Sequence, residues 1–163
     1  MTKCVLPVIA VLSLCFQPGC SDAPSKKSPQ EIYPLRLKVG DRELKTLVAY
    51  TDAARKVGLM NRDTLGEDVG MLFIYAVAPK DEKLGFWMKN TRIPLSIAFI
   101  DDLGEVKQIE DMKAYNLTTV RSRYDVRYAL EVAKGWYEKA GLKEGDLLPD
   151  FPSKVSPFLK AAE

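Results

Sequence analysis

Short apolar runs, separated by breaks of glycine, aspartate and other polar residues, recur along most of this chain. Residues 35–39 (Leu-Arg-Leu-Lys-Val) alternate apolar and polar side chains, as a half-buried strand does. Gly40, Gly104 and Gly145 each fall in a polar break between such runs, and they predict turns between antiparallel strands. Many short strands joined by turns favour a β-rich barrel or sandwich.

The same signals place the other elements. Thr51 is a suitable N-cap for a short helix over residues 52–57, which Gly58 can end, and a second short helix is expected over residues 135–140. Further strands are expected at residues 44–50, 70–75, 95–99, 106–109, 127–132 and 147–148, and around Trp87, with an irregular connection at 115–124. We therefore expect one α+β, mainly β domain over residues 31–150: a compact barrel-like or sandwich antiparallel sheet with two short helices.

An export signal is expected in residues 1–19. Lys3 gives a positive start, and the apolar run over residues 5–16 is too short to span a bilayer. The junction Gly19-Cys20-Ser21 resembles the bacterial lipoprotein processing site, where the cysteine receives a diacylglyceryl group and becomes the new N-terminus. Gln17 departs from that pattern, which usually has an aliphatic residue there. A plainly secreted protein and an uncleaved anchor are the alternatives.

The remaining terminal segments are expected to lie outside the folded domain. Residues 20–30 are rich in Ser, Pro, Lys and Asp and predict a flexible tether, while residues 151–163 are expected to be a C-terminal tail. With Cys20 as the lipidation site, this organisation predicts a membrane-anchored lipoprotein on the extracytoplasmic side of the cell envelope. It would face the periplasm if the cell has two membranes.

The composition excludes several kinds of active site. The chain has no histidine, and its three cysteines (Cys4, Cys15 and Cys20) all lie in the signal region. Thiol nucleophiles, His-based triads and thiolate or imidazole metal sites are therefore unavailable to the exported domain, and we expect no metal and no cofactor. The formal net charge is only +2 and no basic block is present, so nucleic acid is not an expected partner.

One motif points most directly to function: residues 85–95, Gly-Phe-Trp-Met-Lys-Asn-Thr-Arg-Ile-Pro-Leu. Strand alternation would turn Phe86 and Met88 to one face, and Trp87 and Lys89 to the other. An indole and an ammonium group side by side, away from the core, suit a small polar or anionic ligand. The alternative is a structural indole covering one end of the barrel, with Lys89 extended over it.

Other candidate site residues also have structural interpretations. Asn90 either contacts the ligand or forms a turn, and Arg55 and Arg62 either converge on an anion or lie solvated on the surface. Glu131 lies inside an apolar strand. We expect it either to pair with an arginine, such as Arg55, Arg62 or Arg92, or to sit at a sheet edge in water, because a lone buried carboxylate is costly.

Motifs spread over residues 44–148 also share their order and spacing with one family. They are Gly58-Leu59-Met60 with Arg62, Gly70-Met71-Leu72-Phe73, Phe86 to Thr91, Ile93-Pro94-Leu95, Phe99-Ile100-Asp101 with Gly104, Leu130-Glu131, Gly135 and Gly145-Asp146. In these the chain resembles the bacterial and archaeal family called domain of unknown function 192. The family's biochemical role is not established, so the resemblance implies a compact β-rich fold but no reaction. One departure is Ser96, where the family commonly has Asp.

Two classes of function remain open. The first is a binding or accessory module, which would use Trp87, Lys89 and Asn90 to hold a small polar ligand, a glycan or an envelope partner. The second is an envelope-associated hydrolase with carboxylate, hydroxyl or lysine chemistry, which would need an acid/base pair from Asp101, Glu131 and Lys89. Asp101 could equally be a turn former. The lack of a recognisable nucleophile motif favours binding, and enzymatic activity stays an open question.

Overall fold

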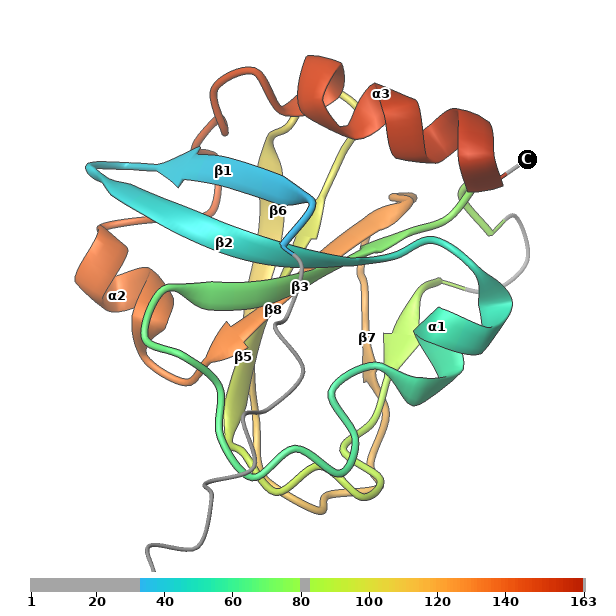
Figure 1. The fold of residues 1–163 in the computed structure, drawn as a ribbon, viewed down its shortest axis with the longest axis vertical. Coiled ribbons are helices and arrows are strands. Elements are labelled where there is room, and N and C mark those ends of the chain that lie inside the picture. Colours follow the sequence, from blue (N-terminus) through green and yellow to red (C-terminus); the bar gives the residue numbers. More distant parts are fainter. Residues whose placement is uncertain (1–32, 80–82, 163) are drawn as a thin grey trace, which may run out of the picture. The chain divides into compact units, whose positions relative to one another are not determined.

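A six-stranded mixed sheet forms the centre of the fold (Figure 1). The computed structural model describes residues 33–79 and 83–162, so the predicted signal and tether lie outside the described residues. The strands, in sheet order, are β1 (Leu35–Val39), β2 (Arg42–Ala49), β3 (Val69–Ile74), β8 (Tyr128–Ala133), β5 (Leu95–Ile100) and β6 (Val106–Met112). A two-stranded sheet pairs β4 (Gly85–Phe86) with β7 (Val120–Arg121). In the described part of the chain the main sheet is open, which confirms the sandwich-like alternative rather than a closed barrel.

One pair of neighbouring strands departs from the predicted antiparallel sheet, since β2 and β3 run parallel. Parallel neighbours need a long crossover, and here it contains helix α1 (Asp52–Val57). The predicted cap is confirmed: the Thr51 hydroxyl accepts a hydrogen bond from the Ala54 N–H, and Gly58 ends the helix with φ 49°. The crossover therefore places α1 at the end of β2 and β3.

The predicted glycine turns are confirmed at two of three positions. Gly40 joins β1 to β2 and Gly104 lies between β5 and β6, both with positive φ and between antiparallel strands. Gly145 also lies in a turn, but it follows helix α2 (Trp136–Ala140) rather than a strand. The strand expected at residues 147–148 is a single bridge between Leu147 and Glu105.

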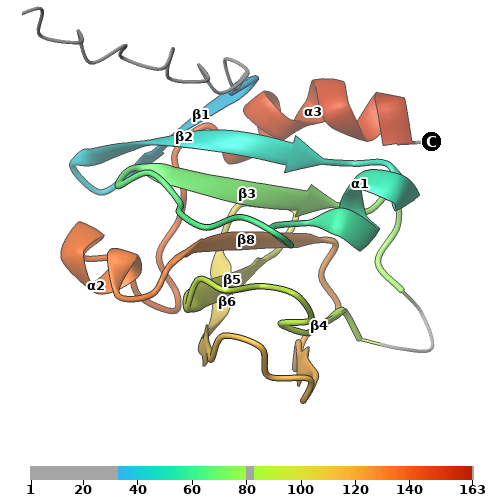
Figure 2. The ribbon, with the colours of Figure 1, turned by 60° about the horizontal axis from the view of Figure 1, so that its bottom comes forward.

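Both faces of the main sheet are covered by apolar side chains. On one face, α2 and α3 (Phe151–Ala162) pack on a cluster that includes Leu37, Leu72 and Leu130. On the other face, α1 and the segment around β4 cover a second cluster, which includes Phe73 and Ile97. Figure 2 shows β1, β2, β3 and β8 side by side, with α2 and α3 at two ends of the first face. The second face is the one that carries the candidate site.

The sequence predicted a C-terminal tail outside the folded domain, but this segment packs on the domain. It forms α3, a helix of 12 residues with Phe151 and Val155 buried. Two prolines made this helix hard to predict from the sequence. Pro152 lies in the first turn, where its missing N–H breaks no helical hydrogen bond, and Pro157 lies inside the helix. The helix therefore rests on tertiary packing rather than on intrinsic propensity. Residues 33–79 and 83–162 thus form three helices where the sequence predicted two.

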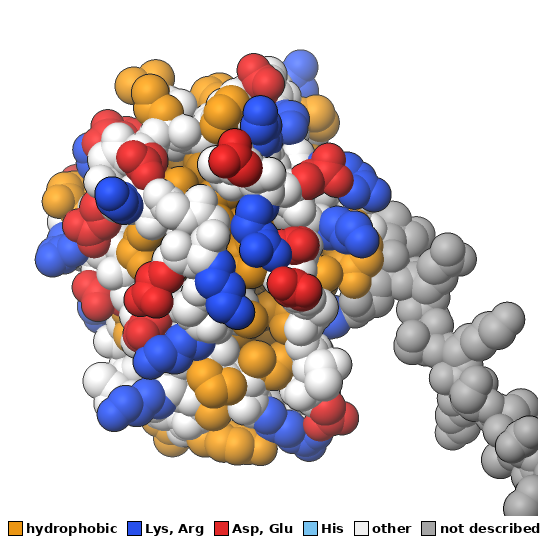
Figure 3. Space-filling model, turned by 90° about the vertical axis from the view of Figure 1, so that its left-hand side faces the viewer, with side chains coloured by type: hydrophobic (Ala, Val, Ile, Leu, Met, Phe, Trp, Pro, Cys, Tyr) orange, Lys and Arg blue, Asp and Glu red, His pale blue; other side chains and the backbone are white. Residues whose placement is uncertain are grey.

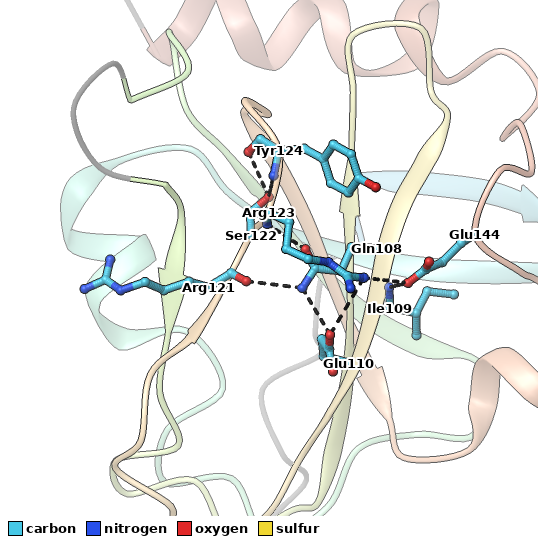
Figure 4. A network of polar contacts seen from close by, with 8 residues as sticks. All are labelled: Gln108, Ile109, Glu110, Arg121, Ser122, Arg123, Tyr124 and Glu144. Carbon is cyan, nitrogen blue, oxygen red and sulfur yellow. Dashed lines mark hydrogen bonds and ion pairs between the residues drawn. The ribbon is translucent and has the colours of Figure 1, made fainter.

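A buried polar side chain fixes the small sheet against the large one (Figure 4). The Gln108 amide on β6 donates hydrogen bonds to the Arg121 carbonyl and to the Glu110 carboxylate, each at 3.2 Å, and its oxygen accepts one from the Arg123 N–H at 2.7 Å. Residues 115–124, expected to be irregular, thereby contribute β7. Since β7 pairs with β4, this network positions the segment that leads to Trp87.

Candidate ligand-binding site

A cavity of about 520 Å³ lies beside Trp87, on the second face of the sheet. Its lining comes from α1 and the residues after it, from the end of β3, from β4 and the segment that follows it, and from the middle of β8. The lining residues are Arg55, Lys56, Val57, Gly58, Leu59, Met60, Phe73, Tyr75, Gly85, Phe86, Trp87, Lys89, Asn90, Thr91 and Glu131. This volume falls in the usual range for small-molecule sites.

A second, smaller cavity of about 350 Å³ adjoins the first. The two cavities share Tyr75, Gly85, Phe86 and Trp87, and the second adds the cationic side chains of Lys83 and Arg121. Trp87 therefore stands between two hollows of one surface.

The alternation of faces predicted around Trp87 is confirmed, but the expected strand is shorter than predicted, since β4 ends at Phe86 and Trp87 follows it. Phe86 and Met88 are buried in the second cluster, whereas Trp87 keeps 50% of its surface exposed and Lys89 is exposed beside it. The Lys89 ammonium nitrogen lies 5.4 Å from the centroid of the indole ring, within cation–π range. The indole and the ammonium group therefore form one surface at the mouth of the cavity.

Asn90 forms a turn, which is one of the two interpretations that the sequence left open, and it also lines the cavity. The Thr91 N–H donates to the Met88 carbonyl at 3.1 Å, which closes a β-turn, and Asn90 occupies its third position with φ 53°. Asparagine tolerates this left-handed backbone better than most residues. Its carbonyl accepts a hydrogen bond from the Asn61 N–H at 2.9 Å, which joins the turn to the loop after α1. Asn90 is thus both a turn former and a lining residue.

Glu131 occupies the floor of the cavity, and neither sequence expectation for it is correct. It lies on the central strand β8, opposite Met71 on β3 and Ile97 on β5, so it is not at a sheet edge. It is 5% exposed, and no hydrogen bond or ion pair joins its carboxyl group to another described residue. Burial raises its pKa from 4.5 to about 8. Glu131 is therefore largely protonated at neutral pH.

Arg55, one of the arginines expected to reach Glu131, has other partners. Its guanidinium donates to the carbonyl oxygens of Tyr50 and Ile74, at 2.6 and 2.7 Å, and forms an ion pair with Asp52. It also lies over the ring of Tyr75, 4.6 Å from the centroid. Arg55 thus ties α1 to the ends of β2 and β3, and it lines the cavity as a positioning residue rather than as a solvated side chain.

The other predicted cations and carboxylates do not converge here. Arg92 pairs with Asp63, and Arg62 is not among the lining residues, so Arg55 and Arg62 do not converge in this cavity. Asp101 accepts hydrogen bonds from two backbone N–H groups of the turn between β5 and β6, both at 2.9 Å. The turn interpretation of Asp101 is therefore the correct one, and among the described residues that line the cavity Glu131 alone carries a carboxyl group.

Ser96, the departure from the family pattern, belongs to the opposite face of the sheet. Its hydroxyl donates to Asp111 on the neighbouring strand β6 at 2.6 Å, and Lys134 forms an ion pair with the same carboxylate. The hydrogen bond from Ser96, followed by that from Lys134, lowers the pKa of Asp111. Adjacent residues of a strand face opposite sides of the sheet, so Ile97, and not Ser96, packs in the second cluster, below the cavity. The change at Ser96 therefore does not alter the cavity.

Sequence reasoning missed much of the apolar wall. Leu59, Phe73 and Tyr75 line the cavity, yet the sequence indicated them only as parts of an expected strand (Phe73 and Tyr75) or of a family motif (Leu59 and Phe73). Their role depends on the parallel β2–β3 crossover, which brings α1 over the end of β3. The one available signal was the position of Glu131, a carboxylate in the middle of an otherwise apolar strand.

The described part of the chain shows neither a membrane-spanning helix nor a metal-type cluster. No helix within residues 33–79 and 83–162 has the length and hydropathy to cross a bilayer. Over the same residues, no three His, Cys, Asp or Glu side chains gather closely enough to hold a metal ion.

The fold is that of a small open-sheet α+β domain with a cavity on one face. Residues 35–149 match the model of the family DUF192, described as an uncharacterized ACR, and the matched range contains every residue that lines the cavity. The chain belongs to this family, as its motifs predicted.

Two solved structures are similar to the chain. One is a candidate transcription regulator from Sinorhizobium meliloti 1021, with 32% identity and a TM-score of 0.63, covering 70% of this chain and 89% of that one. The other is a protein of unknown function from Novosphingobium aromaticivorans DSM 12444, with 28% identity and a TM-score of 0.60, covering 70% and 81%. No curated protein matches the chain in sequence.

Proposed function

We propose that this protein is a membrane-tethered binding or accessory module of the cell envelope, and that it holds a small polar ligand in the cavity beside Trp87. The observation that carries this proposal is the half-exposed indole, with Lys89 beside it, at the mouth of a ligand-sized cavity. Burying the exposed part of an indole, roughly 100 Å² of apolar surface, would contribute about 2.5 kcal/mol to binding.

The envelope location rests on the N-terminal sequence. The apolar run over residues 5–16 and the Gly19-Cys20-Ser21 junction favour export followed by lipidation, and the tether over residues 20–30 would hold the domain off the membrane. A small ligand from the envelope, or a polar part of an envelope component, would then be within reach of the cavity.

Nucleic acid is not part of this proposal, although one similar structure is described as a candidate transcription regulator. The face of the molecule that bears α2 carries lysine and arginine interspersed with aspartate and glutamate (Figure 3). The formal net charge of +2 likewise gives little long-range attraction to a polyanion.

An envelope-associated hydrolase is the second candidate function, and the raised pKa of Glu131 favours it. A carboxyl group with a pKa of about 8 in a cavity could act as a general acid. The predicted partner Asp101 lies in the turn between β5 and β6, however, and the described lining of the cavity holds no carboxylate besides Glu131. Turnover of an envelope substrate by the wild-type chain, abolished in Glu131→Gln, would establish the hydrolase instead.

Ligand binding should depend on Trp87 and Lys89. In a thermal-shift screen of small polar compounds with the full chain, a ligand at 100 times its Kd should stabilise the protein by about 2.7 kcal/mol. Trp87→Ala and Lys89→Ala should each lower the affinity for such a ligand at least tenfold. Lys89→Ala should change the unfolding free energy by less than about 0.5 kcal/mol, because the side chain is exposed.

A matched control for these variants is Lys38→Ala, which removes an exposed lysine from β1, outside the cavity lining. It should bind every hit with wild-type affinity. Hits that bind Trp87→Ala as tightly as the wild type would show that the cavity is not the site.

Cys20 should carry the lipid anchor. Cells expressing the full chain and fed a fatty-acid analogue should label the wild-type protein, whereas Cys20→Ala should stay unlabelled and leave the membrane fraction. Cys15→Ala is the control, since that residue would be removed with the signal, and it should be labelled as the wild type is. Equal labelling of Cys20→Ala would contradict the anchor.

A further inference from the structure

We propose that the ligand of this cavity carries an ammonium group, which lies against the carboxylate of Glu131. This inference deepens the proposed function and rests on it, because it names the chemical class of the ligand and the group that recognises it.

The first argument is the burial of Glu131 without a partner. It sits on the central strand between Met71 and Ile97, it is 5% exposed, and the small remaining surface belongs to the cavity lining. No described residue gives its carboxyl group a hydrogen bond or an ion pair. Once ionised, a carboxyl group buried here needs a counter-charge, and a cationic group of the ligand can supply it.

The second argument is the aromatic wall. Phe73 and Phe86 meet edge to face with their centroids 5.0 Å apart, and Tyr75 and Trp87 complete the lining. Aromatic faces attract cations, and two of these four rings already carry one: Arg55 on Tyr75 and Lys89 on Trp87. A ligand ammonium group inside the cavity would therefore meet both a carboxylate and aromatic rings.

The charged groups around the cavity set the orientation of the ligand. From α1, Arg55 is neutralised by its ion pair with Asp52, and Lys56 is exposed. Lys89, from the segment after β4, is also exposed and lies over Trp87. An ammonium group is therefore favoured at the buried end of the cavity, and any anionic group of the same ligand at the outer end, near the lysines.

Two tyrosines also interact with Glu131. Tyr75 lies at the end of β3, and burial raises its pKa, with a smaller contribution from Glu131. Tyr137 of α2 is buried, donates its hydroxyl to the Leu130 carbonyl at 2.6 Å, and has its pKa raised by burial and then by Glu131. Both phenols stay protonated over the pH range used below, so Glu131 is the group that titrates.

Binding then carries a defined proton balance. Before binding at neutral pH the Glu131 carboxyl group holds a proton, since its pKa is about 8. When the ammonium group docks, the carboxyl group ionises, the proton leaves to solvent, and the ion pair forms with no covalent bond made. As the pH is raised toward about 8, the affinity for the ammonium ligand should therefore increase by up to tenfold per pH unit. Above about pH 8 the affinity should become constant.

The test uses three probes of similar shape with the full chain: phenethylamine, 2-phenylethanol and phenylacetate. Isothermal titration at pH 6, 7 and 8, in buffers of different ionisation enthalpy, measures both the affinity and the protons exchanged. Phenethylamine should bind at least tenfold tighter than the other two at pH 8, and should release close to one proton at pH 6. A simple alkylammonium group stays charged at these pH values.

Two variants assign the effect. Glu131→Gln keeps the shape of the side chain without the charge, and it should lose the preference for the amine together with the proton release. Glu43→Gln, which removes an exposed carboxylate paired with Arg36 on the neighbouring strand, should behave as the wild type.

The outcomes separate this inference from the function it rests on. Equal binding of the alcohol or the acid at pH 8, unchanged in Glu131→Gln, would overturn the ammonium inference and leave the cavity as a binding site for another class of ligand. Failure of all three probes would also overturn it. The proposed function itself would be overturned only if the hits of the thermal-shift screen bind Trp87→Ala as tightly as the wild type.

Discussion

Replacing Glu131 by glutamine should stabilise the folded domain by roughly 5 kcal/mol at pH 9 and change little near pH 4. The Glu131 pKa is raised from 4.5 to about 8 in the folded state, so between these values the folded chain binds more protons than the unfolded chain. Its stability therefore falls as the pH rises through this window. The difference between the two pKa values corresponds to roughly 5 kcal/mol of folding stability. The wild-type chain loses this stability as the pH rises, and the loss is complete above about pH 8.

Urea unfolding of the full chain at pH 4, 6, 7.5 and 9 checks this expectation. The difference in unfolding free energy between Glu131→Gln and wild type should grow steadily over the series, because all other groups titrate alike in both proteins. Glu43→Gln should instead follow the wild-type profile, since its carboxylate is exposed. Parallel profiles for Glu131→Gln and wild type would mean that Glu131 has the same pKa in the folded and unfolded chain, and would contradict the effect of its burial.

The features that the sequence predicted well are local ones. The alternation of residues 35–39, the N-cap at Thr51 and the turn at Gly40 depend on neighbouring residues alone, and each is found in the structure. The opposed faces of Phe86 and Trp87 follow from the same two-residue period. Local periodicity was thus enough to identify the exposed indole and the ammonium group beside it.

The features that the sequence did not predict depend on contacts between distant segments. The parallel pairing of β2 and β3 comes from a crossover whose direction no local signal gives. Helix α3 contains Pro157 and forms on a face that exists only after the sheet is assembled. In both cases tertiary packing outweighs the local pattern.

Glu131 shows the same limit within the site. Its position in an apolar strand was visible, but the strand's place at the centre of the sheet was not, so an edge position or an arginine partner was the natural expectation. The candidate arginines are held by other groups, Arg55 by two backbone carbonyls and Arg92 by Asp63. The structure leaves a carboxyl group facing a cavity, which the sequence had no means to show.

Replacing Phe151 by alanine should lower the unfolding free energy by about 3–5 kcal/mol. The Phe151 ring is fully buried at the start of α3 and meets Tyr128 edge to face with centroids 5.1 Å apart. Its neighbour Gly104 has no room for a side chain, since an added Cβ would lie 2.8 Å from that of Phe151. The ring is therefore closely packed, and its removal leaves a cavity that the backbone around Gly104 cannot fill.

Urea unfolding at one fixed pH measures this loss, and Lys160→Ala provides the control. Lys160 lies in the last turn of the same helix with its side chain exposed, so its removal should change stability by less than about 0.5 kcal/mol. A loss below about 1 kcal/mol for Phe151→Ala would mean that α3 adds little to the fold, as a tail would. A loss of the expected size would show that residues 151–162 are part of the folded domain. Removing a ring lowers the global stability only if its segment is packed in the native state.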